Sequence, residues 1–139
     1  MDMKIRYGGG KKVAADFEGF TVLTDQSVTD GGEGSAPSPF DFFLTSLGAC
    51  AGFYVYSFCE SRNIDPRGIV LQLRDQRSKD DTRLETVRIR IELPSDFPEK
   101  YRKAVIRSVE QCSVKKAINH PPEFEIRVSE KKNYPKIAP

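Results

Sequence analysis

The stretch that decides the fold covers residues 35–50, SAPSPFDFFLTSLGAC, where a loop of small residues and prolines turns into a long apolar run. The Ser38 side chain is suited to accept hydrogen bonds from the first free amides of a helix, and Pro39 suits its first turn. The run ends near Arg62, ahead of the Asp-Pro breaker at 65–66. The sequence therefore predicts one long helix from Pro39 to about Arg62.

This helix is long enough to cross a membrane, but its composition does not favour that role. Its polar and small residues are Asp41, Thr45, Ser46, Gly48, Gly52, Tyr54, Tyr56 and Ser57. Because the remaining apolar residues lie on nearly every face, we expect a helix buried inside a soluble protein or a dimer. No membrane is expected as a partner.

Short alternating segments flank the long helix on both sides. They predict strands over residues 3–6, 11–17 and 20–25 before the helix, and a hairpin over 69–74 and 86–93 after it. A second helix is expected from Ser95, with an apolar stripe whose phase shifts at Cys112. This shift predicts a kink and a short third helix that stops before His120.

The C-terminal part completes the expected order of elements. Phe124, Ile126 and Val128 alternate with charged residues and predict a last strand, and the tail from Lys131 is expected to be loosely held. Grouped helices and dominant hairpins indicate an α+β fold with antiparallel sheets around a long central helix. The length of 139 residues suits a single domain over 1–139.

Composition and charge exclude several classes of function. With 22 Lys and Arg against 20 Asp and Glu, the net charge of +2 does not favour nucleic acid as a partner. One histidine and no CxxC pair predict neither a metal site nor a cofactor that needs one. The polar opening MDMKIRYGGGKK contains no secretory signal, and three cysteines fit a reducing compartment, so we expect a cytoplasmic protein.

The three cysteines are the side chains best suited to redox chemistry. Cys50 and Cys59 share the long helix but face opposite ways, so they cannot pair without destroying it. Cys112 lies at the predicted kink, where the free amides of a new helix can stabilise a thiolate. A Cys50–Cys112 pair is geometrically allowed, although periodicity alone does not demonstrate it. The alternative is that all three cysteines pack as small apolar residues.

Three segments together resemble the OsmC/Ohr family. They are the SAPSPFDFFLTSLGAC run, the hairpin that ends in IRIELP, and the VEQCSVKKAI stretch at 109–118. In that family a proline-rich loop leads into a central helix that carries the first cysteine, and the second cysteine opens a later helix. The resemblance covers nearly the whole chain and implies an intertwined homodimer with active sites at the subunit interface.

The resemblance also implies a function, because the family's members are thiol-dependent peroxidases of organic hydroperoxides. By position, Cys50 matches the peroxidatic cysteine and Cys112 the resolving one. A sulfenic acid on Cys50 and then a Cys50–Cys112 disulfide would form in turn, and an external dithiol of the lipoyl or thioredoxin type would reduce the pair. Cys59 matches nothing in the motif and is expected to pack.

Two positions depart from the family pattern. The family pairs an Arg from its N-terminal sheet with a Glu ten residues before the first cysteine, a position that Phe40 occupies here. The N-terminal Gly-Gly-Arg of many members reads Gly-Gly-Gly-Lys-Lys. Lys12 and Lys11 are therefore the candidate cations for the Cys50 thiolate, and Arg6 ranks below them.

Two functions remain open from the sequence. The first is the two-cysteine peroxidase, and the second is a non-enzymatic dimer of the same fold that binds an apolar ligand and keeps its cysteines for packing. Within the first, the roles could also be exchanged. Cys112 is the thiol near a helix start, whereas Cys50 lies in mid-helix and would depend on a cation.

Overall fold

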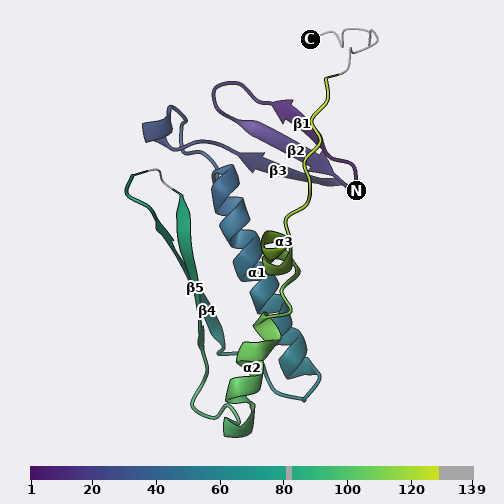
Figure 1. Ribbon diagram of the computed structural model, residues 1–139, viewed down its shortest axis with the longest axis vertical. Coiled ribbons are helices and arrows are strands. Elements are labelled where there is room, and N and C mark those ends of the chain that lie inside the picture. The colour runs from purple at the N-terminus through teal and green to yellow at the C-terminus, as the bar shows by residue number, and fades with distance from the viewer. Residues whose placement is uncertain (81–82, 129–139) are drawn as a thin grey trace.

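One long helix organises the chain, with small sheets and short helices arranged along it (Figure 1). The computed structural model describes residues 1–80 and 83–128. Its elements are β1 Lys4–Tyr7, β2 Val13–Phe17, β3 Phe20–Thr24, η1 Val28–Asp30, α1 Pro39–Glu60, β4 Val70–Arg77, β5 Leu84–Glu92, η2 Glu99–Tyr101, α2 Arg102–Val109 and α3 Ser113–Asn119. The α+β prediction is confirmed.

The strands form two separate antiparallel sheets. The first has the order β1-β2-β3, and the second is the β4-β5 hairpin. In the hairpin, Leu71 lies opposite Ile91 and Leu73 opposite Ile89, so alternate side chains of both strands point to one face. Figure 1 shows α1 beside this hairpin and the three-stranded sheet beyond the start of α1.

The loop that leads into α1 is organised by a buried carboxylate. Asp25, only 1% exposed, accepts hydrogen bonds from the backbone N–H groups of Gln26, Glu33 and Ser35 and from the Ser35 hydroxyl. These bonds hold the pKa of Asp25 at about 2, with the Ser35 bonds contributing most. Gly32 is tightly enclosed, since a Cβ there would lie 2.1 Å from the Gln26 carbonyl oxygen.

The start of α1 follows the sequence prediction. The Ser38 hydroxyl accepts from the Asp41 N–H at 3.2 Å, and the Asp41 carboxylate accepts from the Ser38 N–H at 2.8 Å. This reciprocal capping box satisfies two groups that a helix end would leave unpaired. The helix ends at Glu60, two residues before the expected end.

The main core lies at the C-terminal half of α1. Its buried members are Val55, Phe58, Cys59, Phe97 and Val105. The partly buried residues packed against them come from the β4-β5 hairpin, from α2 and from the segments that flank these elements, so the hairpin and the second helix close over the same half of α1. This packing fixes α2, and through α2 the position of α3.

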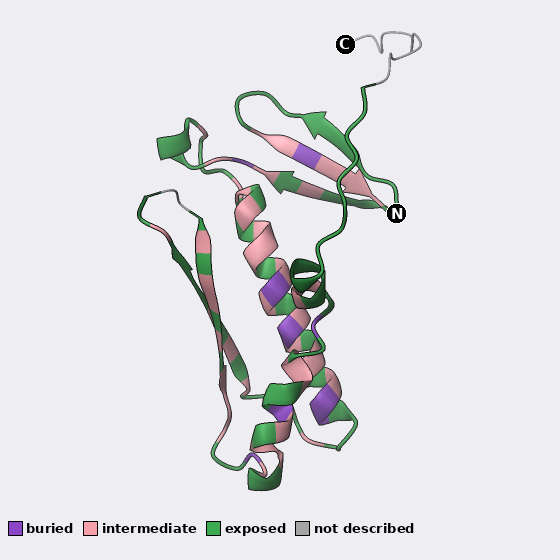
Figure 2. Cartoon of the chain, viewed as in Figure 1, coloured by how far each residue is buried: buried purple, intermediate pink, exposed green. Residues whose placement is uncertain are grey.

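One side of α1 is not covered within the single chain (Figure 2). The exposed residues form a stripe, here called the open stripe, of Thr45, Ala49, Phe53, Tyr56 and Glu60. Phe53 is 62% exposed and Tyr56 50% exposed. An 18-residue window of α1 has a mean hydropathy of 1.4 and is 28% buried, so length and composition alone would permit a membrane span. The core helix of a soluble protein meets the same condition.

Three details differ from the sequence prediction. Lys11 and Lys12 lie in the β1-β2 turn, because β2 begins only at Val13. The second helix is shorter than expected and begins as a 3₁₀ turn at Glu99. Residues 121–128 form no strand, since their apolar side chains meet no strand edge: Phe124, Ile126 and Val128 are 84%, 92% and 98% exposed. The tail from Lys131 lies outside the described residues.

Candidate active site

Two cysteines that are far apart in the sequence meet beside the middle of α1. Cys50 lies on α1 and is partly buried, and Cys112 lies between α2 and α3 and is 2% exposed. The Cys112 thiol donates a hydrogen bond to the Cys50 sulfur. The two side chains that the sequence singled out as a possible pair are therefore in contact.

The kink that positions Cys112 is confirmed, and its physical cause is visible. Cys112 is the N-cap residue of α3, and its Sγ accepts from the backbone N–H of Lys115 at 3.5 Å. The Lys115 ammonium also pairs with the Glu110 carboxylate across the kink. One residue later, the Ser113 hydroxyl shares a hydrogen bond of 3.3 Å with the Tyr54 hydroxyl of α1.

The surroundings of Cys50 favour its thiolate form. Burial by itself would raise the pKa of the Cys50 thiol, but three hydrogen bonds act in the other direction. The first comes from the Cys112 thiol, and the others come from the backbone N–H groups of Val114 and Ser113. The pKa of Cys50 is lowered as a result, since hydrogen bonds to the charged form stabilise it.

The other two thiols are less acidic. Burial raises the pKa of Cys112, and its hydrogen bond to Cys50 raises it further, because a donor must keep its proton. Burial also raises the pKa of Cys59, against a small opposing effect of Arg62. Cys59 is fully buried in the core and contributes to packing. Of the three thiols, only Cys50 has a lowered pKa.

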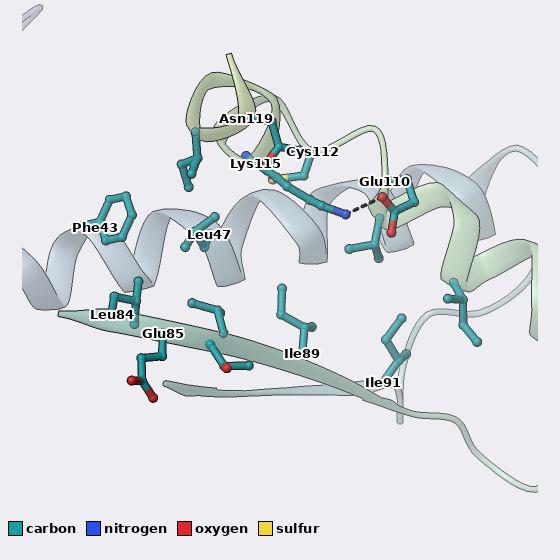
Figure 3. A pocket seen from close by; sticks show the side chains of 15 residues that line it. Phe43, Leu47, Leu84, Glu85, Ile89, Ile91, Glu110, Cys112, Lys115 and Asn119 are labelled. Carbon is teal, nitrogen blue, oxygen red and sulfur yellow. Dashed lines mark hydrogen bonds and ion pairs between the residues drawn. The ribbon is translucent and has the colours of Figure 1, made fainter. Parts of the chain in front are cut away.

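An apolar cavity of about 560 Å³ opens beside this pair of thiols (Figure 3). It lies between α1, β5, α2 and α3. Its apolar lining includes Phe43, Leu47, Ile89, Ile91, Val109 and Ile118. Cys112 forms part of the wall, and Glu110 and Lys115 place a charged pair at the same side. The cavity can therefore accept an apolar molecule that reaches the Cys112 side chain.

The structure does not bring the expected cations to Cys50 within one chain. The Lys12 Nζ lies 2.6 Å from the Glu33 Oε2, and this contact raises the pKa of Lys12. Lys11 is exposed in the same turn. Arg6 is bound by both oxygens of Asp16. The groups that lower the pKa of Cys50 are the Cys112 thiol, which the sequence proposed as a partner, and two backbone amides, which have no sequence signature.

Nothing in the described ranges, 1–80 and 83–128, suggests a bound metal. No group of three or more His, Cys, Asp or Glu side chains there could hold an ion. The site is instead built from sulfur, backbone N–H groups and apolar side chains. Two thiols in such an arrangement can be oxidised to a disulfide when an external two-electron oxidant accepts the electrons.

Several solved structures share the fold of this chain. A structure from Psychrobacter arcticus, provisionally assigned to osmotic stress induction and detoxification, is 27% identical and has a TM-score of 0.73. The alignment covers 86% of this chain and 88% of that chain. An OsmC-like protein from Mycoplasma pneumoniae has a TM-score of 0.69 at 16% identity, covering 86% and 87%. No curated protein matches the sequence.

An organic hydroperoxide resistance protein from Bacillus subtilis shares the fold at 18% identity, with a TM-score of 0.54 over 87% of this chain and 93% of that chain. The long central helix and the two antiparallel sheets therefore define an α+β fold that these structures share. The chain belongs to the OsmC-like protein family, whose pattern matches residues 32–127.

Proposed function

We propose that this protein is a two-cysteine peroxidase that reduces organic hydroperoxides, with Cys50 as the attacking thiol and Cys112 as the resolving thiol. The observation that carries the proposal is the direct contact between the two thiols, in which Cys50 has a lowered pKa and Cys112 keeps its proton. The names of several similar structures support the choice of substrate, since they are organic hydroperoxide resistance proteins.

The first chemical step forms a sulfenic acid. The Cys50 thiolate attacks the terminal oxygen of ROOH, the O–O bond breaks, and the alkoxide takes up a proton and leaves as ROH. The oxygen remains on sulfur as Cys50–SOH. Backbone amides of α3 favour the thiolate that this step consumes, because they donate hydrogen bonds to Cys50.

The second step uses the neighbouring thiol. Cys112 loses its proton and attacks the Cys50 sulfur, a disulfide forms, and the sulfenic oxygen leaves as water. An external dithiol, of the lipoyl or thioredoxin type, then reduces the disulfide by thiol–disulfide exchange and is itself oxidised. The short path between the two sulfurs favours fast resolution, which protects Cys50 from further oxidation.

The cavity supports organic rather than hydrogen peroxide as the substrate. Its lining is largely aliphatic and aromatic, so the organic group of ROOH gains from leaving water there. Cys112 lines the wall and contacts Cys50, so a peroxide group at this wall lies beside Cys112 and one side chain away from the attacking sulfur. Hydrogen peroxide has no group to fill the cavity.

A homodimer forms part of this proposal. The open stripe leaves Phe53 and Tyr56 in solvent, and residues 121–128 present a row of uncovered apolar side chains. We propose that two α1 helices pack together along the open stripes and that 121–128 finds its strand partner in the assembled dimer.

The test of the peroxidase compares two oxidants under one reductant. With dithiothreitol present, the protein should consume cumene hydroperoxide at least about tenfold faster than hydrogen peroxide, because only the former gains from the cavity. Cys50→Ser should consume neither, since a serine hydroxyl supplies no thiolate at neutral pH. Equal rates for the two oxidants would contradict the cavity as the binding site, and an active Cys50→Ser would contradict the mechanism.

The dimer is tested by sedimentation at micromolar concentration. The wild-type protein should sediment as a dimer, and Phe53→Asp should sediment as a monomer, because it places a charge in the middle of the open stripe. Phe20→Asp is a matched control, since Phe20 is 67% exposed but lies on β3, away from α1. A wild-type monomer, or a Phe53→Asp dimer, would contradict the proposed packing.

One observation favours a second function, a carrier of an apolar ligand. Cys112, not Cys50, lies in the cavity wall, and the pKa of Cys112 is raised, so the thiol facing the ligand is unreactive. A carrier would bind a fatty acid equally well in wild-type protein and in Cys50→Ser, and it would consume no peroxide.

A further inference from the structure

We propose that the Tyr54 hydroxyl is a positioning group for the Cys50 thiol, because it holds Ser113 and thereby the start of α3 against α1. This role rests on the proposed two-thiol function. The proposal is based on the hydrogen bond of 3.3 Å between the Tyr54 and Ser113 hydroxyls. Tyr54 does not touch the reacting atoms and acts only through α3.

The spacing of the residues explains how the Tyr54–Ser113 contact supports the Cys50–Cys112 contact. Tyr54 follows Cys50 by four residues on α1, so both side chains lie on the same face of the helix. On the other side, Ser113 follows Cys112 directly. Two contacts therefore join α1 to the start of α3 about one helical turn apart: thiol to thiol, and hydroxyl to hydroxyl.

Besides the N–H groups of Ser113 and Val114 that donate to Cys50, few polar contacts attach α3 to the long helix. None of the seven residues of α3 is buried, and Ser113 itself is exposed. Among the residues that the structure describes, the Tyr54–Ser113 bond is the only one between a side chain of α1 and a side chain of α3. The placement of α3 therefore depends on this bond, on the packing of α2 against α1 and on the buried cap residue Cys112.

The placement of α3 matters because its backbone N–H groups contact the Cys50 sulfur. The N–H groups of Ser113 and Val114 donate to Cys50. The Ser113 hydroxyl and the Ser113 N–H belong to one residue, so fixing the hydroxyl also fixes the amide. Hydrogen bonds weaken steeply when the donor angle or distance changes. Loss of the Tyr54 hydroxyl should therefore weaken the stabilisation of the Cys50 thiolate.

The experiment follows the pH profile of Cys50 alkylation by iodoacetamide, with the Cys50 peptide quantified by mass spectrometry. In Tyr54→Phe the midpoint should move upward and the thiolate fraction at pH 7 should fall about threefold. Tyr56→Phe is the matched control, because Tyr56 is 50% exposed on the open stripe and makes no side-chain hydrogen bond in the described structure. Its profile should equal that of the wild type.

Three further variants separate positioning from a general loss of structure. Ser113→Ala should reproduce the Tyr54→Phe profile, the double variant should shift no further, and Ser113→Thr should restore the wild-type profile because it keeps a hydroxyl. Thermal midpoints of all variants should stay close together. Additive shifts in the double variant, or a Tyr54→Phe profile equal to the wild type, would overturn the role of Tyr54.

The proposed function can fail independently of this role. A wild-type protein with a lowered Cys50 pKa that consumes no hydroperoxide would overturn the peroxidase. The alkylation profiles would still decide the role of Tyr54, since they measure the thiol alone and not turnover.

Discussion

The thiols of Cys50 and Cys112 share a hydrogen bond in which Cys112 is the donor, although a hairpin and a helix separate them in the sequence. This direction gives the two sulfurs unequal chemistry, because the acceptor is stabilised as a thiolate and the donor is stabilised as a thiol. This difference in pKa suits Cys50 to attack a peroxide as a thiolate and Cys112 to remain a thiol until the disulfide forms.

The roles of the two thiols lead to the first prediction. Cys112→Ser should consume one equivalent of cumene hydroperoxide and stop as a sulfenic acid on Cys50, which dimedone traps for mass spectrometry. The wild-type protein should yield a Cys50–Cys112 disulfide with little trapped adduct. If Cys112→Ser is inactive and Cys50→Ser consumes one equivalent, the two roles are exchanged.

The third cysteine gives a second prediction. Cys59→Ala should lower the free energy of unfolding by about 1–2 kcal/mol, because it leaves a small void in the core. Peroxide consumption should be unchanged in the folded variant. After oxidation of the wild type, Cys59 should remain alkylatable once the protein is unfolded, and a mapped Cys50–Cys59 disulfide would contradict the structure of α1.

The buried carboxylate of Asp25 predicts how stability depends on pH. Its pKa falls from 3.8 to about 2 on folding, chiefly through the hydrogen bonds of Ser35. The stabilisation is therefore complete above about pH 4 and is lost as the pH falls towards 2. Asp25→Asn should have a lower thermal midpoint at pH 7 and a smaller loss of that midpoint between pH 4 and 2. Parallel curves for the two proteins would contradict this assignment.

A substitution of Lys12 tests whether a cation from the same chain or from a second copy of the chain acts on the Cys50 thiolate. Because Lys12 pairs with Glu33 and not with Cys50, Lys12→Met should leave the Cys50 alkylation profile of a monomeric variant such as Phe53→Asp unchanged. The matched control is Lys11→Met in the same turn. A rise in the Cys50 pKa that appears only in the dimer would assign the cation to the N-terminal turn of the second subunit.

Several features of the fold could be predicted from the sequence because their causes are local. Ser38 and Pro39 define the start of α1 by capping, and the change of apolar phase defines the kink at Cys112. Both depend on residues within a few positions of each other. The pairing of Cys50 with Cys112 was an open alternative on spacing alone and was implied by the family resemblance.

The remaining features depend on contacts that a linear pattern does not contain. The amides of Ser113 and Val114 reach Cys50 because α2 packs on the second half of α1, a contact between distant parts of the sequence. Backbone groups of this kind have no sequence signature. Alternation predicted a strand over residues 124–128, and the structure forms none there, because a strand also needs a neighbouring edge and the described chain offers none to them.

The cap on α3 has a consequence for the shape of the oxidised protein. In the reduced form, the Cys112 sulfur accepts from the Lys115 N–H and so completes the first turn of α3. A disulfide turns that sulfur towards Cys50 and makes it a poorer acceptor, so α3 loses its cap as the disulfide forms. We expect oxidation to loosen the segment that covers the disulfide, which would open a path for a bulky reducing protein and couple the redox state of the chain to its local order.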